Sequence, residues 1–375
     1  MNEQERILAV LNGGLPDKTP WFADLSYWIF SLQERGLLPE EYQGEGGYIA
    51  FHRDQGAGAC FEYNAVLWDI TYSGGVRYTE KVEGDVKTCV FDTPSGSLTS
   101  RQKYLKTSFS WAYTEHFVKD FDDLKRMLYV HEHTEFKANY DTFDRISALW
   151  GGDGLLAATP VICAAPLQKL LSRWAGVEAT VSLVYEDDET FGKINEDIQR
   201  TEDAVFDILA ASGAKYVEFA ENLSSEVTGR AFFERFNQGY YERRTRQLHR
   251  AGKFCGIHID GTLAPCLGML KGCGFDVAEG ITPAPVGTVA PERLRELAGD
   301  GIVLWGGLPG PIFTGLFSDE QFEAYVSRVL ALFPPGSGFV LGVGDQVPPD
   351  CAPGRVKRVR DIVDSHAGCS CFQKG

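Results

Sequence analysis

The second half of the chain alternates amphipathic stretches with short apolar runs. An acid-rich helix pattern covers 187–211 and ends at Gly213, as helix C-termini prefer, and a second pattern covers roughly 230–251. Strands that alternate with helices predict a parallel sheet. Five apolar runs of strand length, each following a helix pattern with a glycine near its end, are AKYVEFA (214–220), GKFCGIHID (252–260), GCGFDVAEG (272–280), GIVLWGG (301–307) and GFVLGVG (338–344).

The first half of the chain adds two strands and an irregular region. DKTPWFADLS (17–26) and GLLAATPVICAA (154–165) have strand character, and the segment before them, 1–13, has the pattern of an amphipathic helix. Residues 60–120 alternate polar and apolar positions and are predicted to form a β-hairpin insertion over the barrel mouth. We therefore expect a single α/β domain over 1–375, a (β/α)8 TIM barrel with an N-terminal cap and this insertion, because 375 residues suit a decorated barrel.

Composition narrows the class of protein. The formal net charge is −16, and an acidic chain repels nucleic acid, so we expect no nucleic-acid partner. No apolar run is long enough to span a bilayer, and the polar N-terminus does not resemble a secretory signal. Nine scattered cysteines, an odd number, indicate reduced thiols. These features predict a cytoplasmic protein without a membrane partner.

In an α/β barrel the chemistry lies at the C-terminal ends of the strands. The polar residues that end the apolar runs are therefore the candidates. They are Glu218, Glu221, His258, Asp260, Glu279 and Asp345.

His258 and Asp260 are two residues apart, so their side chains point to the same face of a strand. An imidazole and a carboxylate at this spacing can bind a divalent metal, or can form a hydrogen-bonded pair without one. Glu221 and Glu279 end the strands on either side, and neighbouring strands lie about 4.8 Å apart. Because clustered acids repel one another without a cation, the set favours a metal site over substrate-binding or helix-capping carboxylates.

The last strand and three aromatic residues give further candidates. Asp345 could be a ligand or a general acid or base, or a turn residue before the two prolines that follow. Tyr27, Trp28 and Trp111 lie near segments predicted at the barrel mouth, where they could stack on a substrate ring, although buried aromatics more often belong to a core. His131, in a polar connection, is interpreted as part of a solvated face.

Several motifs resemble one family in their order and spacing. ERILAVLNGGLPDKTPW (5–21) is similar to the N-terminal signature of the uroporphyrinogen decarboxylase superfamily. FCGIHIDG (254–261), the Gly-Phe-Asp at 274–276 and GVGDQVPP (342–349) follow the C-terminal order of the same superfamily. The likeness covers most of the chain and is weakest at 60–120.

The resemblance leaves two enzyme groups to compare. The decarboxylases bind an acidic tetrapyrrole with an arginine-rich segment after the first strand, whereas WFADLSYWIFSLQ (21–33) holds no arginine. The second group moves methyl groups to or from the cobalt of a corrinoid on a separate protein. Its coenzyme M-directed members use His-x-Cys and a later Cys as zinc ligands; here His258 matches, but Asp260 and Asp345 stand at or near the cysteine positions.

Oxygen and nitrogen ligands leave zinc a stronger Lewis acid than thiolates do, which suits an ether oxygen as leaving group. The chain also resembles the first methyltransferases of bacterial O-demethylase systems. That resemblance implies Zn²⁺ held by Glu221, His258 and Glu279. In the reaction expected here, Asp260 or Asp345 would handle protons.

The expected reaction moves a methyl group from a small aryl methyl ether to cobalt. The corrinoid (cobalamin) would come from a partner corrinoid protein, since the chain has no Asp-x-His-x-x-Gly segment of its own. Three alternatives stay open at this point. They are a second methyltransferase that passes the methyl group to tetrahydrofolate or a thiol, a metal-free lyase, and a corrinoid-binding or regulatory module without activity.

Overall fold

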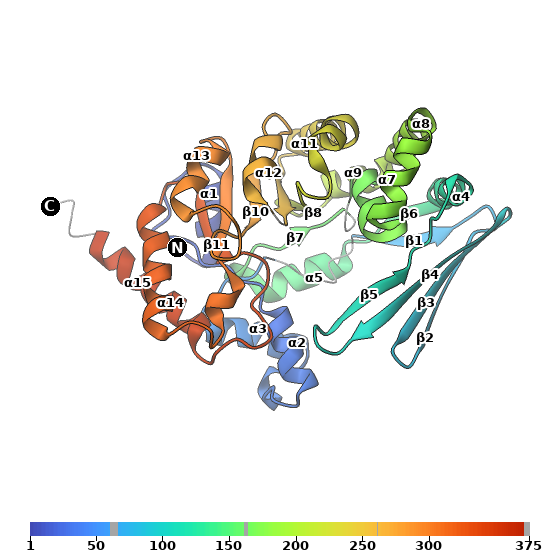
Figure 1. Ribbon diagram of the computed structural model, residues 1–375. Helices are drawn as coiled ribbons and strands as arrows, with labels where there is room; N and C mark the ends of the chain where they lie inside the picture. The colour runs from blue at the N-terminus through green and yellow to red at the C-terminus, as the bar shows by residue number, and fades with distance from the viewer. Residues whose placement is uncertain (61–66, 161–163, 261, 371–375) are drawn as a thin grey trace.

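The computed structural model describes residues 1–60, 67–160, 164–260 and 262–370. Six parallel strands form one sheet in the order β12-β11-β10-β9-β8-β7 (Figure 1). They match the five apolar runs of the second half and the run that begins at 154. The strands are β7 (Ala157–Ala158), β8 (Tyr216–Leu223), β9 (Phe254–Ile259), β10 (Val277–Ile281), β11 (Val303–Leu308) and β12 (Phe339–Val343).

Two further extended segments close this sheet into a barrel. Trp21 pairs in parallel with Leu341 of β12, and Phe22 pairs in parallel with Gly58. Ala59 then pairs in parallel with Gly154, at the start of the β7 segment. Backbone hydrogen bonds run through each junction, including Phe22 N–H to Leu341 O at 3.0 Å. Eight parallel segments therefore follow one another around the ring, which confirms the (β/α)8 barrel.

Helices occupy the connections between the barrel segments, and one more helix, α15, follows the last strand. Among the described residues, none of them is both long enough and apolar enough to cross a bilayer. Along the chain they are α2 (Ser26–Glu34), α3 (Gly44–Gln55), α4 (Phe121–Glu132), α5 (Asp141–Trp150), α6 (Pro166–Lys169), α7 (Gly176–Glu186), α8 (Asp188–Thr201), α9 (Asp203–Ala211), α10 (Gly229–Phe232), α11 (Gln238–Arg250), α12 (Leu263–Met269), α13 (Leu294–Ala298), α14 (Asp319–Leu332) and α15 (Arg355–Ser370).

Helix α1 (Glu3–Leu11) is the N-terminal cap. Asn2 and Glu5 form a capping box that satisfies the first free amides of the helix. The apolar face of α1, with Ile7 and Val10, packs in one cluster with residues from the starts of the strands, such as Tyr216 and Val340. The cap therefore covers the N-terminal end of the barrel and leaves the opposite end, where chemistry is expected, open.

The insertion is larger than the predicted hairpin. Strands β2 (Arg77–Glu83), β3 (Val86–Thr93), β4 (Gly96–Leu105) and β5 (Ser110–Glu115) form a four-stranded antiparallel sheet that extends away from the barrel (Figure 1). A separate ribbon pairs β1 (Trp68–Tyr72) with β6 (Thr134–Ala138). An isolated hairpin is marginally stable, whereas β3 and β4 of this sheet pack against α4, in one cluster that includes Phe91, Leu98 and Leu124.

The helix pattern at 187–211 is divided in the structure. Helix α8 ends at Thr201 and α9 begins at Asp203. Between them, Glu202 is 2 % exposed and its carboxylate contacts Lys169, which is also buried. The turn directs this carboxylate inward to a buried cation, a tertiary contact that helical periodicity does not contain.

His52 is a buried histidine on α3 whose ionisation opposes folding. Its ring lies 4.9 Å from that of Tyr48 and 5.1 Å from that of Trp150, and its Nε2 has no hydrogen-bond partner among the described residues. Burial lowers the pKa of His52 to about 4, although the charge of Asp24 and the carbonyl of Ala57 act in the opposite direction. The ring is therefore neutral in the folded protein at neutral pH.

This burial predicts a pH dependence of stability. His52 takes up a proton near pH 6.5 in the unfolded chain but only near pH 4 in the folded chain. The free energy of unfolding therefore has its full value above pH 6.5 as far as His52 is concerned, and it decreases as pH falls from 6.5 towards 4. Between pH 7 and pH 5 the loss should be about 2 kcal/mol of the free energy of unfolding. His52→Gln should remove this part of the slope that urea titrations of the wild-type protein show. Equal slopes in the variant and in the wild type would contradict the prediction.

Candidate active site at the barrel mouth

The parallel register sets His258 beside Glu279. These residues are direct partners on β9 and β10, and Glu218 on β8 is the partner of Gly256, two residues before His258. The Nδ1 atom of His258 contacts Oε2 of Glu279, and its Nε2 lies 3.6 Å from Oδ1 of Asp260. The structure thus places one imidazole between a buried carboxylate and a half-exposed one.

The two carboxylates favour the protonated form of His258. Burial opposes charge on the ring, but the charge of Glu279 and the hydrogen bonds with Asp260 and Glu279 together hold its pKa well above the ordinary value. The pKa of Asp260 is lowered, first by its hydrogen bond with His258. In the protein alone, the central pair is therefore an imidazolium and an ionised aspartate.

Glu218 lies in the barrel interior and completes an acidic set. It is fully buried; its Oε2 contacts the hydroxyl of Tyr216, and its Oε1 has no hydrogen-bond partner among the described residues. Burial and then the charge of Glu279 raise its pKa well above the ordinary value. Gly256 makes room for this arrangement, since a Cβ there would lie 1.8 Å from the Tyr216 hydroxyl oxygen and 2.4 Å from Glu218 Oε2.

Asp345 faces the same group from the end of β12. Its side chain opens to solvent, yet desolvation by the surrounding protein and the charges of Asp260, Glu279 and Asp24 raise its pKa to about 6, against the opposing effect of His258. Asp345, Asp24 and Glu279 line one small cleft with Cys60 and Trp305. The structure therefore brings His258, Asp260, Glu279 and Asp345 together, as the sequence predicts.

Glu221 is directed away from this group. Its Oε1 accepts the backbone N–H of Ala165 at 3.0 Å, and the residue is 1 % exposed. Burial raises its pKa to about 7, while the amides of Ala165 and Ala164 and the charge of Lys169 act in the opposite direction. The glutamate of β8 that lies near His258 and Glu279 is therefore Glu218.

The three predicted substrate-binding aromatics lie in different surroundings. Tyr27 donates to Ser108 O at 2.7 Å, and burial, followed by the charges of Asp350 and Asp345, raises its pKa. Trp28 is 7 % exposed and packs 5.1 Å from the ring of Phe51, as part of the core. Trp111 lies in the inserted sheet, with the ammonium of Lys87 4.8 Å from its ring centroid. Of the three, Tyr27 is the one whose surroundings include a residue of the site.

Sequence reasoning missed Asp24 and Tyr216. Asp24 ends the first barrel segment, so the rule that selected the other strand ends would also have found it. Tyr216 is two residues before Glu218, and alternation along the strand places both side chains in the barrel interior. Nothing in the sequence signals the contact between them.

A different trio has the tightest spacing of metal-type side chains among the described residues. Ligand atoms of His249, Cys255 and Asp276 all lie within 4.8 Å of one another. This trio is at the start of β9 and β10, the end opposite to the candidate site. Asp276 Oδ2 already accepts the amide of Cys255 at 2.7 Å and contacts His249 Nε2 at 2.8 Å. Among the described residues around His258, no three have ligand atoms that all lie within 4.8 Å of one another.

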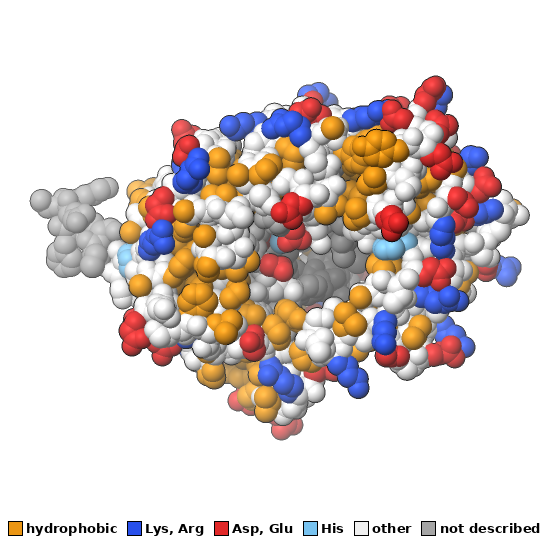
Figure 2. All heavy atoms as spheres, in the orientation of Figure 1, with side chains coloured by type: hydrophobic (Ala, Val, Ile, Leu, Met, Phe, Trp, Pro, Cys, Tyr) orange, Lys and Arg blue, Asp and Glu red, His pale blue; other side chains and the backbone are white. Residues whose placement is uncertain are grey.

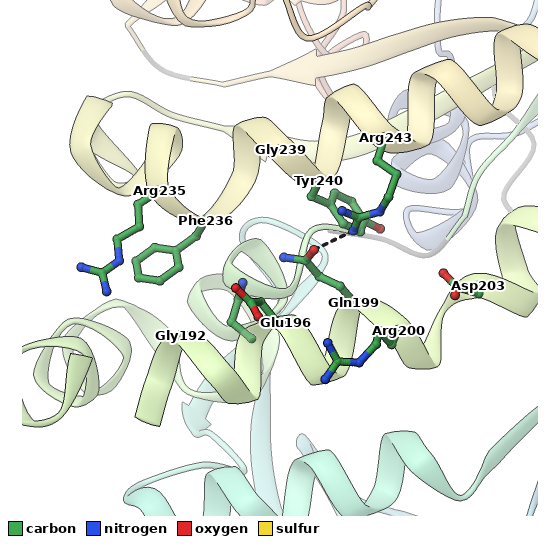
Figure 3. Close-up of a pocket in the computed structure, with 11 residues that line it drawn as sticks. Gly192, Glu196, Gln199, Arg200, Asp203, Arg235, Phe236, Gly239, Tyr240 and Arg243 are labelled. Carbon is green, nitrogen blue, oxygen red and sulfur yellow. Dashed lines mark hydrogen bonds between the residues drawn. The ribbon is translucent and has the colours of Figure 1, made fainter. Parts of the chain in front are cut away.

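The space-filling view shows a hollow in the middle of one face of the molecule, with acidic side chains in and beside it (Figure 2). A separate cavity of about 590 Å³ lies between α8 and the segment formed by η4 (Phe233–Asn237) and α11, on the outside of the barrel (Figure 3). Its described lining includes arginines, among them Arg243 bonded to Gln199 at 2.7 Å, but no histidine or cysteine. The acid–histidine chemistry therefore belongs to the barrel mouth.

The barrel and its mouth define the protein as a (β/α)8 protein with an acid–histidine site at the C-terminal strand ends. The sequence profile of uroporphyrinogen decarboxylase (URO-D) matches residues 112–366. Because this match covers more than half of the chain, the chain belongs to the URO-D family, which confirms the predicted resemblance. Residues 1–111 lie outside the match.

Solved structures agree with the family in fold. The chain is similar to a methyltransferase from Methanosarcina mazei, with a TM-score of 0.59 and 14 % identity over 98 % of this chain and 99 % of that one. At this identity the likeness shows the fold alone. A ribulose-1,5-bisphosphate carboxylase/oxygenase from Pyrococcus horikoshii matches with a TM-score of 0.35 and 11 % identity, over 92 % of this chain and 62 % of that one, which is too low to carry an argument. Comparison with curated proteins gives no match.

Proposed function

We propose that the chain is a zinc-dependent, cytoplasmic methyltransferase that moves a methyl group from a small aryl methyl ether to the cobalt of a partner corrinoid protein. The observation that carries the proposal is the group at the barrel mouth, where His258 lies between Glu279 and Asp260 with Glu218 buried beside them. The similarity in fold to a methyltransferase supports it.

The donor set suits a divalent cation in chemistry and in charge. Glu218, His258 and Glu279 offer oxygen and nitrogen atoms of the type that catalytic zinc sites use. The Oε1 of Glu218 is buried without a partner, and burying a carboxylate beside another one is costly unless a cation compensates both. Glu218, in place of Glu221, would therefore hold the metal with His258 and Glu279. The cation would supply Lewis-acid activation of the leaving ether oxygen.

The other side chains have separate tasks in this proposal. Tyr216, in contact with Glu218, keeps that carboxylate in the barrel interior. Asp260 fixes the His258 ring from the open side. Asp345, with a pKa of about 6 and an accessible side chain, is suited to give a proton to the departing oxygen near neutral pH. Tyr27 lies near Asp345, where it could contact the substrate.

The proposed reaction needs no reagent beyond the methyl ether, the corrinoid and one proton. Cobalt(I) of the carrier protein supplies an electron pair to the methyl carbon, the carbon–oxygen bond breaks, and the oxygen leaves with the bonding pair as a phenolate. A proton from the site then gives the phenol. Holding the ether and the corrinoid in line is an entropic contribution that the mouth of a rigid barrel can provide.

The first barrel segment argues against decarboxylation of a tetrapyrrole. Residues 21–33 hold no arginine, and the next one, Arg35, donates to Ser31 O at 3.0 Å and to the carbonyl of Pro349. The many carboxylates of such a substrate would therefore meet an acidic mouth. A lyase of this kind is disfavoured by charge.

Two assays of the purified protein test the proposal, one with cobalamin as methyl acceptor and one with methylcobalamin as methyl donor. We expect near-stoichiometric zinc by elemental analysis, and demethylation of some members of a panel of methoxylated aromatics with cob(I)alamin as acceptor. Methylcobalamin should be a poor donor to thiols and to tetrahydrofolate. If activity is found only with methylcobalamin as donor, the chain is a second methyltransferase. Absence of both zinc and methyl transfer would overturn the proposal in favour of a lyase or a binding module.

A further inference from the structure

Helix α11 carries an arginine stripe on its solvent-exposed face, formed by Arg243, Arg246 and Arg250. The three residues follow one another at intervals of three and four, so they share one side of the helix over a length of about 10 Å. All three are exposed, and none forms an ion pair with a carboxylate among the described residues. The stripe is therefore a surface with an excess of positive charge.

Helix α15 shows that the chain can pair such cations. It is also rich in lysine and arginine, but Lys357, Arg358 and Arg360 each contact a carboxylate, from Asp54, Glu323 and Asp364 in turn. The formal net charge of the chain is −16, so acidic side chains are abundant. Arginines without a carboxylate in such a chain attract acidic surface from outside it.

A groove of about 590 Å³ runs beside the stripe, between α11 and α8 (Figure 3). Each wall contains a glycine, Gly192 on α8 and Gly239 on α11. At either position a Cβ would meet no heavy atom within 4 Å outside its own helix backbone and its chain neighbours. Alanine would therefore fit at both, and it is the better helix former. The two glycines leave both helix backbones open to close approach by another segment.

The two helices that flank the groove carry opposite charge. Over Asp188–Thr201, α8 has four acidic and two basic side chains, whereas α11 has one acidic side chain and four arginines over Gln238–Arg250. A two-fold axis through the groove would set the acidic helix of one copy against the arginine stripe of the other, and the reverse. A face of this kind is complementary to itself, as two-fold dimers require.

The acids of α8 are accessible to a second copy. Glu196 is exposed and forms no ion pair among the described residues. Glu189 contacts Lys193, but both side chains are well exposed, and exposed pairs of this spacing are weak. The net charge of two copies does not prevent their contact, because charges are largely screened beyond about 8 Å at physiological ionic strength, whereas charges in contact are not.

We propose that the face formed by α8 and α11 is an interface between two copies of this chain, related by a two-fold axis through the groove. Helices of this length, about 20 Å, and about 10 Å across give a footprint of roughly 400 Å² per copy. A standard interface buries about 800 Å² per partner, so the dimer should be weak, with a Kd on the order of 10 μM. Neither helix belongs to the acid–histidine group, so the dimer is independent of the proposed methyltransferase activity.

Sedimentation velocity of the full chain tests this interface. At about 0.15 M salt we expect a dimer whose share rises with protein concentration, and at about 1 M salt a Kd at least about tenfold higher. Arg246→Glu places a carboxylate within the stripe and should also raise the Kd at least about tenfold. Arg77→Glu is the matched control, since it reverses an exposed arginine of β2 in the insertion, and it should dimerise as the wild type does.

Gly239→Trp tests the groove without changing charge. The new side chain enters the open groove and fills the space that the second copy needs, so the dimer should be lost while the thermal unfolding of the monomer is not impaired. A wild-type chain that stays monomeric at about ten times the expected Kd would overturn the inference. A dimer that both Arg246→Glu and Gly239→Trp retain would also overturn it, because that dimer would use another face. These measurements need no metal, corrinoid or methyl donor, so their failure leaves the proposed function untouched.

Discussion

His258→Ala should lose bound zinc and methyl transfer together. The imidazole is the one nitrogen donor of the proposed set, and Glu279 on one side and Asp260 on the other are held in place through it. Without it, the remaining carboxylates repel one another and lack the donors that retain zinc. We expect zinc content near zero and a fall in methyl transfer on the order of 10³-fold or more, as loss of a main electrostatic stabiliser produces.

The matched control for this variant is His249→Ala. His249 belongs to the trio with Cys255 and Asp276 at the opposite end of the barrel. Zinc content and activity should be unchanged in this variant. If His249→Ala loses zinc and His258→Ala keeps it, the metal lies at the base of the barrel and the candidate site is misplaced. Elemental analysis of the two proteins, purified side by side, distinguishes the two outcomes.

Glu218→Gln and Glu221→Gln should differ sharply, although both remove one charge from β8 without changing shape. Glu218 lies with Glu279 and His258, so its replacement should weaken zinc binding about 10–100-fold and reduce methyl transfer at least as much. Glu221 accepts the amide of Ala165 and lies beside Lys169, so zinc affinity should be unaffected by its replacement. Competition with a chelator of known affinity measures the difference.

Glu221→Gln should show its effect in stability instead. The folded pKa of about 7 lies above the ordinary 4.5, so the native residue favours folding below pH 4.5 and loses this contribution as pH rises through 7. The variant should lack this decline in urea titrations. Zinc loss in Glu221→Gln with full retention in Glu218→Gln would return the metal role to Glu221, the residue that the sequence favours.

The barrel could be predicted because the hydrophobic pattern of neighbouring residues indicates each of its strands and helices. Apolar runs such as those of β10 and β12 are buried along their whole length, and the helices between them show one apolar face. The rule that chemistry follows strand ends then selected His258, Glu279 and Asp345 before any contact was known. The two barrel segments at 21–24 and 57–60 are short and pair through isolated bridges. Their sequences therefore show a weaker hydrophobic pattern than the strands of the second half, and the segment at 57–60 was not predicted.

The choice between Glu218 and Glu221 could not be made from the sequence. The two residues are three positions apart, so on a regular strand they point to opposite faces. The pairing of β8 with β9 is irregular between Phe219 and Leu223, and Asn222 has a φ of 48°, which changes the direction of the side chains nearby. Which glutamate enters the barrel therefore depends on this irregularity.

The sequence by itself determined the order of strands and helices, the family, and the strand ends that carry acids and a histidine, because each depends on residues near one another in the chain. Only the tertiary structure decided which acids meet. It placed Glu218 with Glu279, and it buried the Nε2 atom of His131 near the end of α4. The physical reason is that desolvation and charge interactions act through space, between strands and helices whose contacts no local pattern records.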